Sequence, residues 1–194
     1  MSYRLFRFLS LSQSDFKSFL ALVLIVSTFS SCSRDPNVRK QKYVESGERY
    51  FDKAKYQEAA IQFSNAIQID PAYPRAHFDL AKTYLKMQSW PQAYQELNRT
   101  LDLDPENYEA RLNIANLLIE GGDLLEVKNH IDILSADRPD DYRTHVTIAK
   151  FSVVQRDLGG AVSELQKAIA LQPKEAQPYL DLAEVQVELN QFDS

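Results

Sequence analysis

The chain has 194 residues, of which 25% are charged and 44% hydrophobic, and its formal net charge is −5. This composition is that of ordinary folded, soluble material. The acidic balance, with no basic stripe expected, argues against a nucleic-acid binder and against a polybasic membrane binder, and a single cysteine excludes a disulfide within one chain.

The N-terminal segment has the composition of a secretory signal. A basic start is followed by an apolar run of eleven residues over 19–29 (FLALVLIVSTF), and Cys32 comes directly after two serines. The basic residues are Arg4, Arg7 and Lys17. An apolar run of this length fits the core of a signal peptide, about 7–15 residues, and is short for a membrane span of about 20.

Around Cys32 the chain resembles the lipobox of bacterial lipoproteins, whose cysteine is diacylated and becomes the first residue of the mature protein. The resemblance implies a signal peptide over 1–31, a lipid anchor on Cys32 and a short polar tether over 32–39. Ser33 follows the cysteine, which in such lipoproteins points to the outer membrane, on the side facing the periplasm. The alternative is an uncleaved anchor helix with an incidental cysteine.

The rest of the chain is organised by four prolines that recur every 34 residues. They are Pro71, Pro105, Pro139 and Pro173. A Gly or Ala recurs twenty-four positions before each proline, an Ala recurs twelve positions before all but Pro139, where Val127 stands, and a large apolar residue recurs eight positions before each. A fixed period of this length indicates stacked helical hairpins, because small residues let two helix backbones approach and large ones fill the space around them.

The pattern resembles the tetratricopeptide repeat, which has small residues at positions 8, 20 and 27 of its 34-residue unit and a proline at position 32. The resemblance implies an all-α solenoid of helical hairpins, wound as a right-handed superhelix of about 4.5 repeats. The units are 40–73, 74–107, 108–141, 142–175 and a partial fifth over 176–194, which together make a domain over 40–194. The predicted helices are 40–53, 56–70, 74–87, 90–104, 108–120, 124–137, 142–155, 158–172 and 176–190.

Two local features set the units apart. Position 27 of the third unit is Leu134 rather than a small residue, so this unit is expected to pack less tightly. Of the four turns inside the hairpins only one offers the glycine that a left-handed residue favours. The other turns are expected to place more strain on Ala54, Gln88 and Arg156.

No constellation of catalytic or metal-binding residues is evident. The three histidines, His77, His130 and His145, have no Cys or His partner at the spacing of metal ligands, and two of them stand where the repeat has a packing residue. The glycine pairs lack the rest of a phosphate-binding loop. We therefore expect no enzyme activity, no cofactor, no metal and no small-molecule substrate.

In such repeats the first helix of each unit lines a concave groove with its positions 2, 5, 9 and 12. The predicted partner-binding residues, at positions 5 and 9, are Val44, Glu48, Phe78, Lys82, Leu112, Asn116, Val146 and Lys150. Phe78 and Leu112 are expected to anchor apolar groups, and the two lysines to pair with acidic ones. An apolar groove suits an amphipathic helix or an extended apolar peptide. The alternative is that positions 5 and 12 pack between neighbouring helices.

Some members of the family bind a partner's C-terminal carboxylate with Lys or Arg at position 5 and Asn at position 9. The first two units have Val44 with Glu48, and Phe78 with Lys82, so chaperone-tail binding is not expected. The predicted function is a protein–protein scaffold anchored to the bacterial envelope. The alternative is a repeat region of a larger enzyme, such as a glycosyltransferase, or an export-system component. Because the chain stops at Ser194 within the fifth unit, we expect a fragment of a longer repeat protein.

Overall fold

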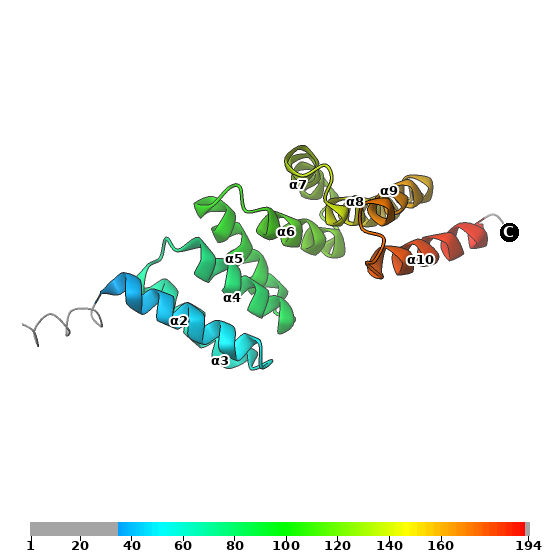
Figure 1. Ribbon diagram of the computed structural model, residues 1–194. Coiled ribbons are helices and arrows are strands. Elements are labelled where there is room, and N and C mark those ends of the chain that lie inside the picture. Colours follow the sequence, from blue (N-terminus) through cyan, green and yellow to red (C-terminus); the bar gives the residue numbers. More distant parts are fainter. Residues whose placement is uncertain (1–34, 193–194) are drawn as a thin grey trace, which may run out of the picture.

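The computed structural model describes residues 35–192, and within this range all regular structure is helical (Figure 1). The helices are α2 (Pro36–Phe51), α3 (Tyr56–Ile69), α4 (Pro74–Lys86), α5 (Trp90–Leu103), α6 (Tyr108–Gly121), α7 (Leu124–Asp137), α8 (Tyr142–Val154), α9 (Leu158–Leu171) and α10 (Gln177–Phe192). The predicted helices are confirmed, with ends that agree within a few residues.

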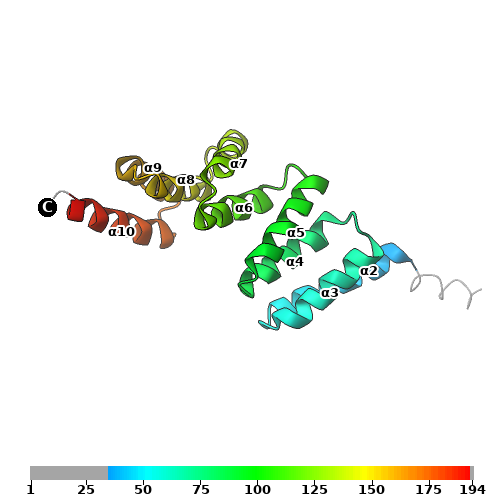
Figure 2. The same ribbon diagram turned by 180° about the vertical axis from the view of Figure 1, so that it is seen from behind.

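The helices pair as consecutive antiparallel hairpins, with α2 on α3, α4 on α5, α6 on α7 and α8 on α9, while α10 packs on α9. Figure 1 shows the hairpins following one another from the blue first helix to the red last one, so the described chain is elongated. The view from behind in Figure 2 shows α2–α5 as one packed group that α6–α10 continue. The predicted all-α helical solenoid is therefore confirmed.

The first helix begins four residues before its predicted start. Asp35 is its N-cap and accepts a hydrogen bond from the backbone N–H of Asn37 at 2.8 Å, and Pro36 occupies the first turn. Proline suits this position because its fixed φ is already helical and its missing N–H would have had no partner. Residues 36–39 thus belong to α2, and the prediction of a tether over 32–39 is wrong for them.

The turns inside the hairpins carry the backbone strain that the sequence indicated. One residue of each turn, at the same position of the 34-residue unit, has a positive φ: Ala54 55°, Gln88 57°, Gly122 80° and Arg156 65°. Only glycine adopts this left-handed region without a steric cost of roughly 1–2 kcal/mol. Three of the four hairpins therefore tolerate a strained residue at the same position.

Inside each hairpin, residue sizes on the two helices are matched. Gly47 on α2 faces Phe63 on α3, and a Cβ added at Gly47 would lie 2.5 Å from a carbon of the Phe63 ring. The later hairpins instead have alanine on the first helix and a smaller Leu or Ile on the second. The residues at these two positions, all buried, are Ala81 and Leu97, Ala115 and Ile131, and Ala149 and Leu165. The largest core side chain thus requires the smallest neighbour.

The third hairpin is the loosest of the four, and α7 contacts α8 less than α3 contacts α4. Leu134 is 1% exposed and packs against Tyr108, Leu112 and Ala115 of α6. Because it is bulkier than the alanine at this position in the first and fourth hairpins, it holds the two helix backbones farther apart. The expected weaker packing of this unit is confirmed.

Successive hairpins are joined by a recurring hydrogen bond to the carbonyl of the periodic proline. His77, six residues after Pro71, places its Nε2 3.1 Å from the Pro71 oxygen. The equivalent contacts join Arg111 to Pro105 at 2.6 Å, His145 to Pro139 at 2.9 Å and Tyr179 to Pro173 at 3.1 Å. Each proline therefore ends one hairpin and also ties it to the first helix of the next.

Candidate functional site

The predicted groove follows the first helices α2, α4, α6, α8 and α10, and its apolar residues differ widely in exposure. Val44 is 1% exposed, and Leu112 and Val146 are each 8% exposed. These three side chains are packed between helices, as the alternative interpretation expected, and offer almost no area to a partner. Phe78 is only partly buried, so it remains available at the surface of α4.

The predicted charged residues of the first two units are already engaged. Glu48 accepts a hydrogen bond from Arg75 at 2.6 Å. The Lys82 Nζ lies 2.7 Å from a carboxylate oxygen of Asp79 and 4.9 Å from the centre of the Phe78 ring. Asp79 is only 5% exposed, and this burial raises the pKa of its carboxyl although the Lys82 hydrogen bond opposes the shift. Lys82 therefore has a structural role, as the partner of a buried carboxylate.

The charged residues at position 2 are likewise paired from one unit to the next. Arg143 on α8 donates to Glu109 on α6 at 2.6 Å, and Arg75 on α4 donates to Glu48 on α2 at the same distance. Asn116 turns back along its own helix and donates to the Leu112 carbonyl at 2.9 Å. By contrast, Lys150 is exposed and makes no ion pair with the described residues.

Two hollows lie along the groove. The first, of ≈ 270 Å³ between α2 and α4, is polar and is lined by Glu48, Asp79 and Lys82 among others. The second, of ≈ 330 Å³, lies where α6, α8 and α10 meet. It is lined by Val153, Val154 and Val185, here called its floor, and by Lys150 with the carboxylates of Glu120, Asp181, Glu184 and Glu188, here called its rim. Glu188 also pairs with Arg156 at 2.6 Å.

The second hollow combines an apolar floor with an excess of acidic groups. Such a surface can take an apolar side chain while a neighbouring cation of the same partner pairs with the rim. The repeat pattern did not indicate this excess, because the rim carboxylates come from the third and fifth units and Lys150 from the unit between them. Glu120 and Glu188 also lie outside the positions assigned to the groove, so only the stacking of the hairpins brings them to Lys150.

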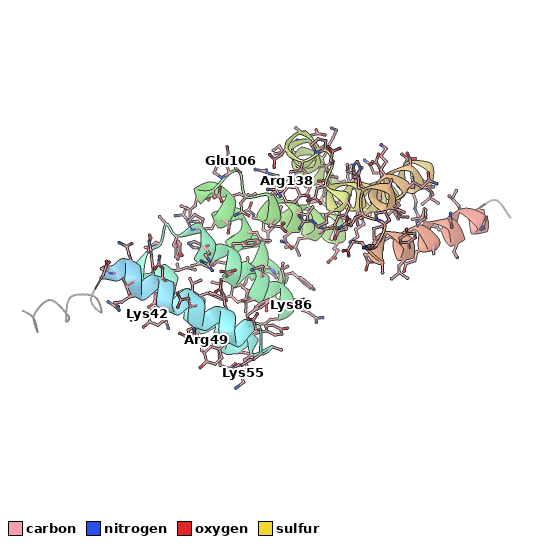
Figure 3. The ribbon with its side chains drawn as sticks, viewed as in Figure 1. Lys42, Arg49, Lys55, Lys86, Glu106 and Arg138 are labelled. Carbon is pink, nitrogen blue, oxygen red and sulfur yellow. The ribbon has the colours of Figure 1, made fainter. Side chains whose placement is uncertain are left out.

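Helix α2 also carries a group of basic side chains on one side, which the repeat pattern did not predict. Arg39, Lys42, Ser46 and Arg49 recur at intervals of three and four residues and so share one side of the helix. That side is opposite to the buried Val44. Figure 3 shows Lys42, Arg49 and Lys55 along one edge of the first hairpin. The expectation that the chain has no basic stripe is therefore wrong, since an acidic net charge conceals a local face of opposite sign.

Within 35–192 no group of three His, Cys, Asp or Glu side chains could hold a metal ion. His77 and His145 bind Glu96 and Glu164 at 2.6 Å each, which places them in the packing of their hairpins. None of the helices in this range is long and apolar enough to span a membrane. Cys32, the predicted lipidation site, lies outside the described residues.

Family models agree with the period found in the sequence. A model described as TPR repeat matches residues 47–88, and a model described as tetratricopeptide repeat matches residues 90–145. Among curated proteins, Hsp70-Hsp90 organizing protein 2 of Arabidopsis thaliana is 31% identical over 71 residues, or 37% of this chain. The chain spans between 12% and 24% of the length of the curated relatives it matches.

Solved structures support the fold. A tetratricopeptide repeat protein from Parabacteroides merdae superposes with a TM-score of 0.74 at 17% identity, covering 91% of this chain and 70% of its own. MamA from Desulfovibrio magneticus superposes with a TM-score of 0.70 at 16% identity, covering 78% and 86%. At these identities the similarity shows a common architecture.

Proposed function

Because the chain is a tetratricopeptide repeat protein, we propose that it is a non-enzymatic adaptor that binds a segment of a partner protein along the first helices of its hairpins. The observation that carries this proposal is the second hollow, where an apolar floor meets an acidic rim. The partner segment presents an apolar side chain to Val153 and Val154, flanked by Lys or Arg that pairs with the rim.

The role of protein-binding adaptor also fits the relatives. The Arabidopsis protein is named for organizing Hsp70 and Hsp90. The first two units of this chain have Val44 with Glu48 and Phe78 with Lys82, which lack the Lys or Arg at position 5 and the Asn at position 9 expected of a carboxylate-binding groove. The proposed partner segment is therefore internal and apolar, with basic flanks, rather than an acidic C-terminal tail.

We further propose that the protein is anchored to a bacterial envelope by a lipid on Cys32, at the outer membrane and facing the periplasm. The support is in the sequence, where an apolar run over 19–29 and two small residues precede the single cysteine. A solenoid anchored at one end leaves its groove free to hold partners close to the membrane. This arrangement is what a scaffold in an envelope assembly requires.

The groove is tested with a charge reversal on its rim. Partners are captured by crosslinking in envelope extracts and identified, and their affinity is then measured with purified proteins. Glu184→Lys should weaken binding about tenfold, in the range of a strong interface residue. Glu106→Lys, an exposed reversal on the loop between α5 and α6 (Figure 3), should change it little. Equal affinity for both variants would refute the assignment of the rim.

Phe78→Ala provides a second test at the other end of the groove. Phe78 packs partly against the core, so the variant must first show unchanged helicity and melting. If partner affinity is then also unchanged, α4 does not contribute to binding.

The anchor is tested by mass spectrometry of the mature protein. We expect the first residue to be a lipid-modified Cys32 and Cys32→Ala to leave the longer precursor. An intact N-terminus with an unmodified Cys32 in the wild type would exclude the anchor without affecting the groove.

A further inference from the structure

Three basic side chains on the outer face of α2 have no partner among residues 35–192. Arg39, Lys42 and Arg49 are exposed and make no side-chain hydrogen bond or ion pair there. Together with Tyr43 and Ser46 they surround a shallow hollow of ≈ 390 Å³. Lys53 and Lys55 extend the same charge into the turn before α3. We call these five basic residues the basic face.

Charge is divided unevenly along the molecule. From the start of α2 to the turn before α3, residues 36–55 contain six Lys or Arg and three Asp or Glu, whereas residues 56–194 contain twelve and twenty-two. One end of the solenoid is thus positive and the remainder is strongly negative. An anionic surface would attract the first hairpin and repel the others, and this gives the molecule a preferred orientation.

We propose that the basic face binds the anionic headgroups of a phospholipid bilayer and so orients the solenoid on the membrane, with its acidic groove directed away. The inference rests on the proposed anchor, because it takes Cys32 as the point of attachment. It goes beyond the anchor, since a lipid on Cys32 would by itself leave the orientation of the hairpins unset.

The distances favour a membrane as the occupant. Four residue steps separate Cys32 from Pro36, a reach of about 14 Å at most, so a lipidated cysteine would hold the start of α2 at the headgroups. The helix is about 24 Å long, and its basic side chains follow its outer side from Arg39 to Arg49. A row of long, exposed cations suits a broad charged plane, and each is worth about fivefold in binding to an anionic surface.

The composition of the face also favours a bilayer over a protein partner. Its side chains are long and polar, apart from the ring of Tyr43, and the hollow that they surround is open rather than enclosed, so it would not bury an anchor residue. Protein interfaces usually centre on such a buried anchor. Tyrosine at the edge of a cationic face is in turn common at the level of lipid headgroups.

The test follows the reaction of individual lysines with an amine-acylating reagent, read by peptide mass spectrometry. Full-length protein is reconstituted into vesicles of phosphatidylcholine alone, or of phosphatidylcholine mixed with phosphatidylglycerol. On the anionic vesicles Lys42 and Lys53 should react at least about threefold more slowly, and added salt should restore their rate. Lys86 and Lys174, exposed on other hairpins, should react equally on both vesicles.

A pair of matched variants separates the basic face from total charge. Arg39→Gln with Arg49→Gln should abolish the protection of Lys42, because two losses of about fivefold weaken the contact about 25-fold. Lys86→Gln with Lys174→Gln removes the same charge elsewhere and should leave Lys42 protected. Equal reactivity of Lys42 on both vesicles in the wild type, or loss of protection in both variants, would overturn the proposal.

Two further measurements identify other causes. The bilayer is the wrong occupant if inorganic phosphate without vesicles slows the acylation of Lys42 as much as anionic vesicles do. It is also the wrong occupant if an added nucleic acid or acidic protein protects Lys42 while vesicles do not. Flotation with phosphatidylcholine vesicles reports the anchor alone. If the protein floats with phosphatidylcholine vesicles but Lys42 shows no charge-dependent protection, the orientation is rejected and the anchor is supported. If Lys42 is protected on anionic vesicles but the protein does not float with phosphatidylcholine vesicles, the basic face is supported and the anchor is rejected.

Discussion

The second and third hairpins follow the same 34-residue plan but are held together differently. In the second, His77 on α4 lies 2.6 Å from Glu96 on α5, and the fourth hairpin repeats this contact. In the third, the same two positions hold Arg111 and His130, which are both basic. No hydrogen bond joins them, and the Nδ1 of His130 is buried without a partner.

The third hairpin is instead supported from its neighbour. The Tyr108 hydroxyl on α6 lies 3.0 Å from the Thr144 hydroxyl on α8, and Arg143 on α8 donates to Glu109 on α6 at 2.6 Å. α6 also contacts α8 more extensively than α2 contacts α4. A solenoid can thus keep a weak hairpin in place by joining its first helix to the next first helix, so stability is shared along the stack.

The largest expected effect comes from the residue that spaces the third hairpin. Leu134→Ala removes a side chain that is 1% exposed, and it should cost about 2–5 kcal/mol of stability in that hairpin. Ala168→Leu makes the opposite change in the fourth hairpin and should cost about 1–3 kcal/mol by overpacking. Hydrogen exchange of the backbone amides in α6–α7 and in α8–α9 measures the loss of stability in each hairpin separately. A neutral Leu134→Ala would mean that Leu134 does not space these helices.

The first hairpin offers a sharper test of size matching. Gly47→Ala places a methyl group against the Phe63 ring and should cost about 1–3 kcal/mol. Adding Phe63→Leu creates the Ala–Leu pair of the other hairpins and should recover most of the loss. Gly121→Ala is the control, because no atom lies within 4 Å of its added Cβ. Thermal melts followed by circular dichroism, with exchange at α2–α3, report the result.

The two hairpins should respond to pH in opposite directions. Burial lowers the pKa of His77, but its bonds to Glu96 and the Pro71 carbonyl more than offset this, so the net pKa is raised. Its stabilisation is complete below about pH 6.5 and is lost as the pH rises through the folded pKa. Burial and the charge of Arg111 lower the pKa of His130, so its contribution is complete above about pH 6.5 and is lost as the pH falls through the folded pKa.

Acidification from pH 8 to pH 5 should therefore tighten α4–α5 and loosen α6–α7. Hydrogen exchange at the two pH values, corrected for the intrinsic rates, measures both in one sample. His77→Gln and His130→Gln should each remove the response of one hairpin only. A parallel response of both hairpins would contradict the assigned partners.

The smallest effect is expected from restoring the missing pair. His130→Glu places a carboxylate opposite Arg111, as Glu96 stands opposite His77, and should stabilise α6–α7 by up to about 1 kcal/mol. Adding Arg111→Gln should cancel the gain. If His130→Glu stabilises α6–α7 by the same amount whether residue 111 is Arg or Gln, the gain comes from removing the buried, unpartnered histidine and not from an ion pair.

The 34-residue period predicted the helices and the buried small residues because these depend on spacing within one unit. It also indicated the strained turns and the loose third hairpin, through Ala54 and Leu134. It did not predict the start of α2, where capping by Asp35 extends the helix past the repeat boundary.

The candidate site was predicted less well, since it depends on contacts between units. Position 5 faces the groove along each helix, yet Val44 and Val146 are covered by neighbouring helices, which no single-unit pattern specifies. Lys82 was expected to meet a partner, but the buried Asp79 binds it. The basic face was hidden because net charge averages over the chain, whereas binding depends on which side chains share one surface.

The hydrogen bond from each proline carbonyl to a donor six residues later has a consequence for how such a chain can change in length. Each junction between successive hairpins has its own local hydrogen bond of this kind, and His, Arg and Tyr side chains all serve as the partner of the proline carbonyl. Duplicating or deleting a whole unit reproduces the junction intact, whereas an insertion between proline and donor separates the two. The spacing thus divides the chain into interchangeable parts, and gene duplication can lengthen the groove by one hairpin at a time without requiring a new contact elsewhere.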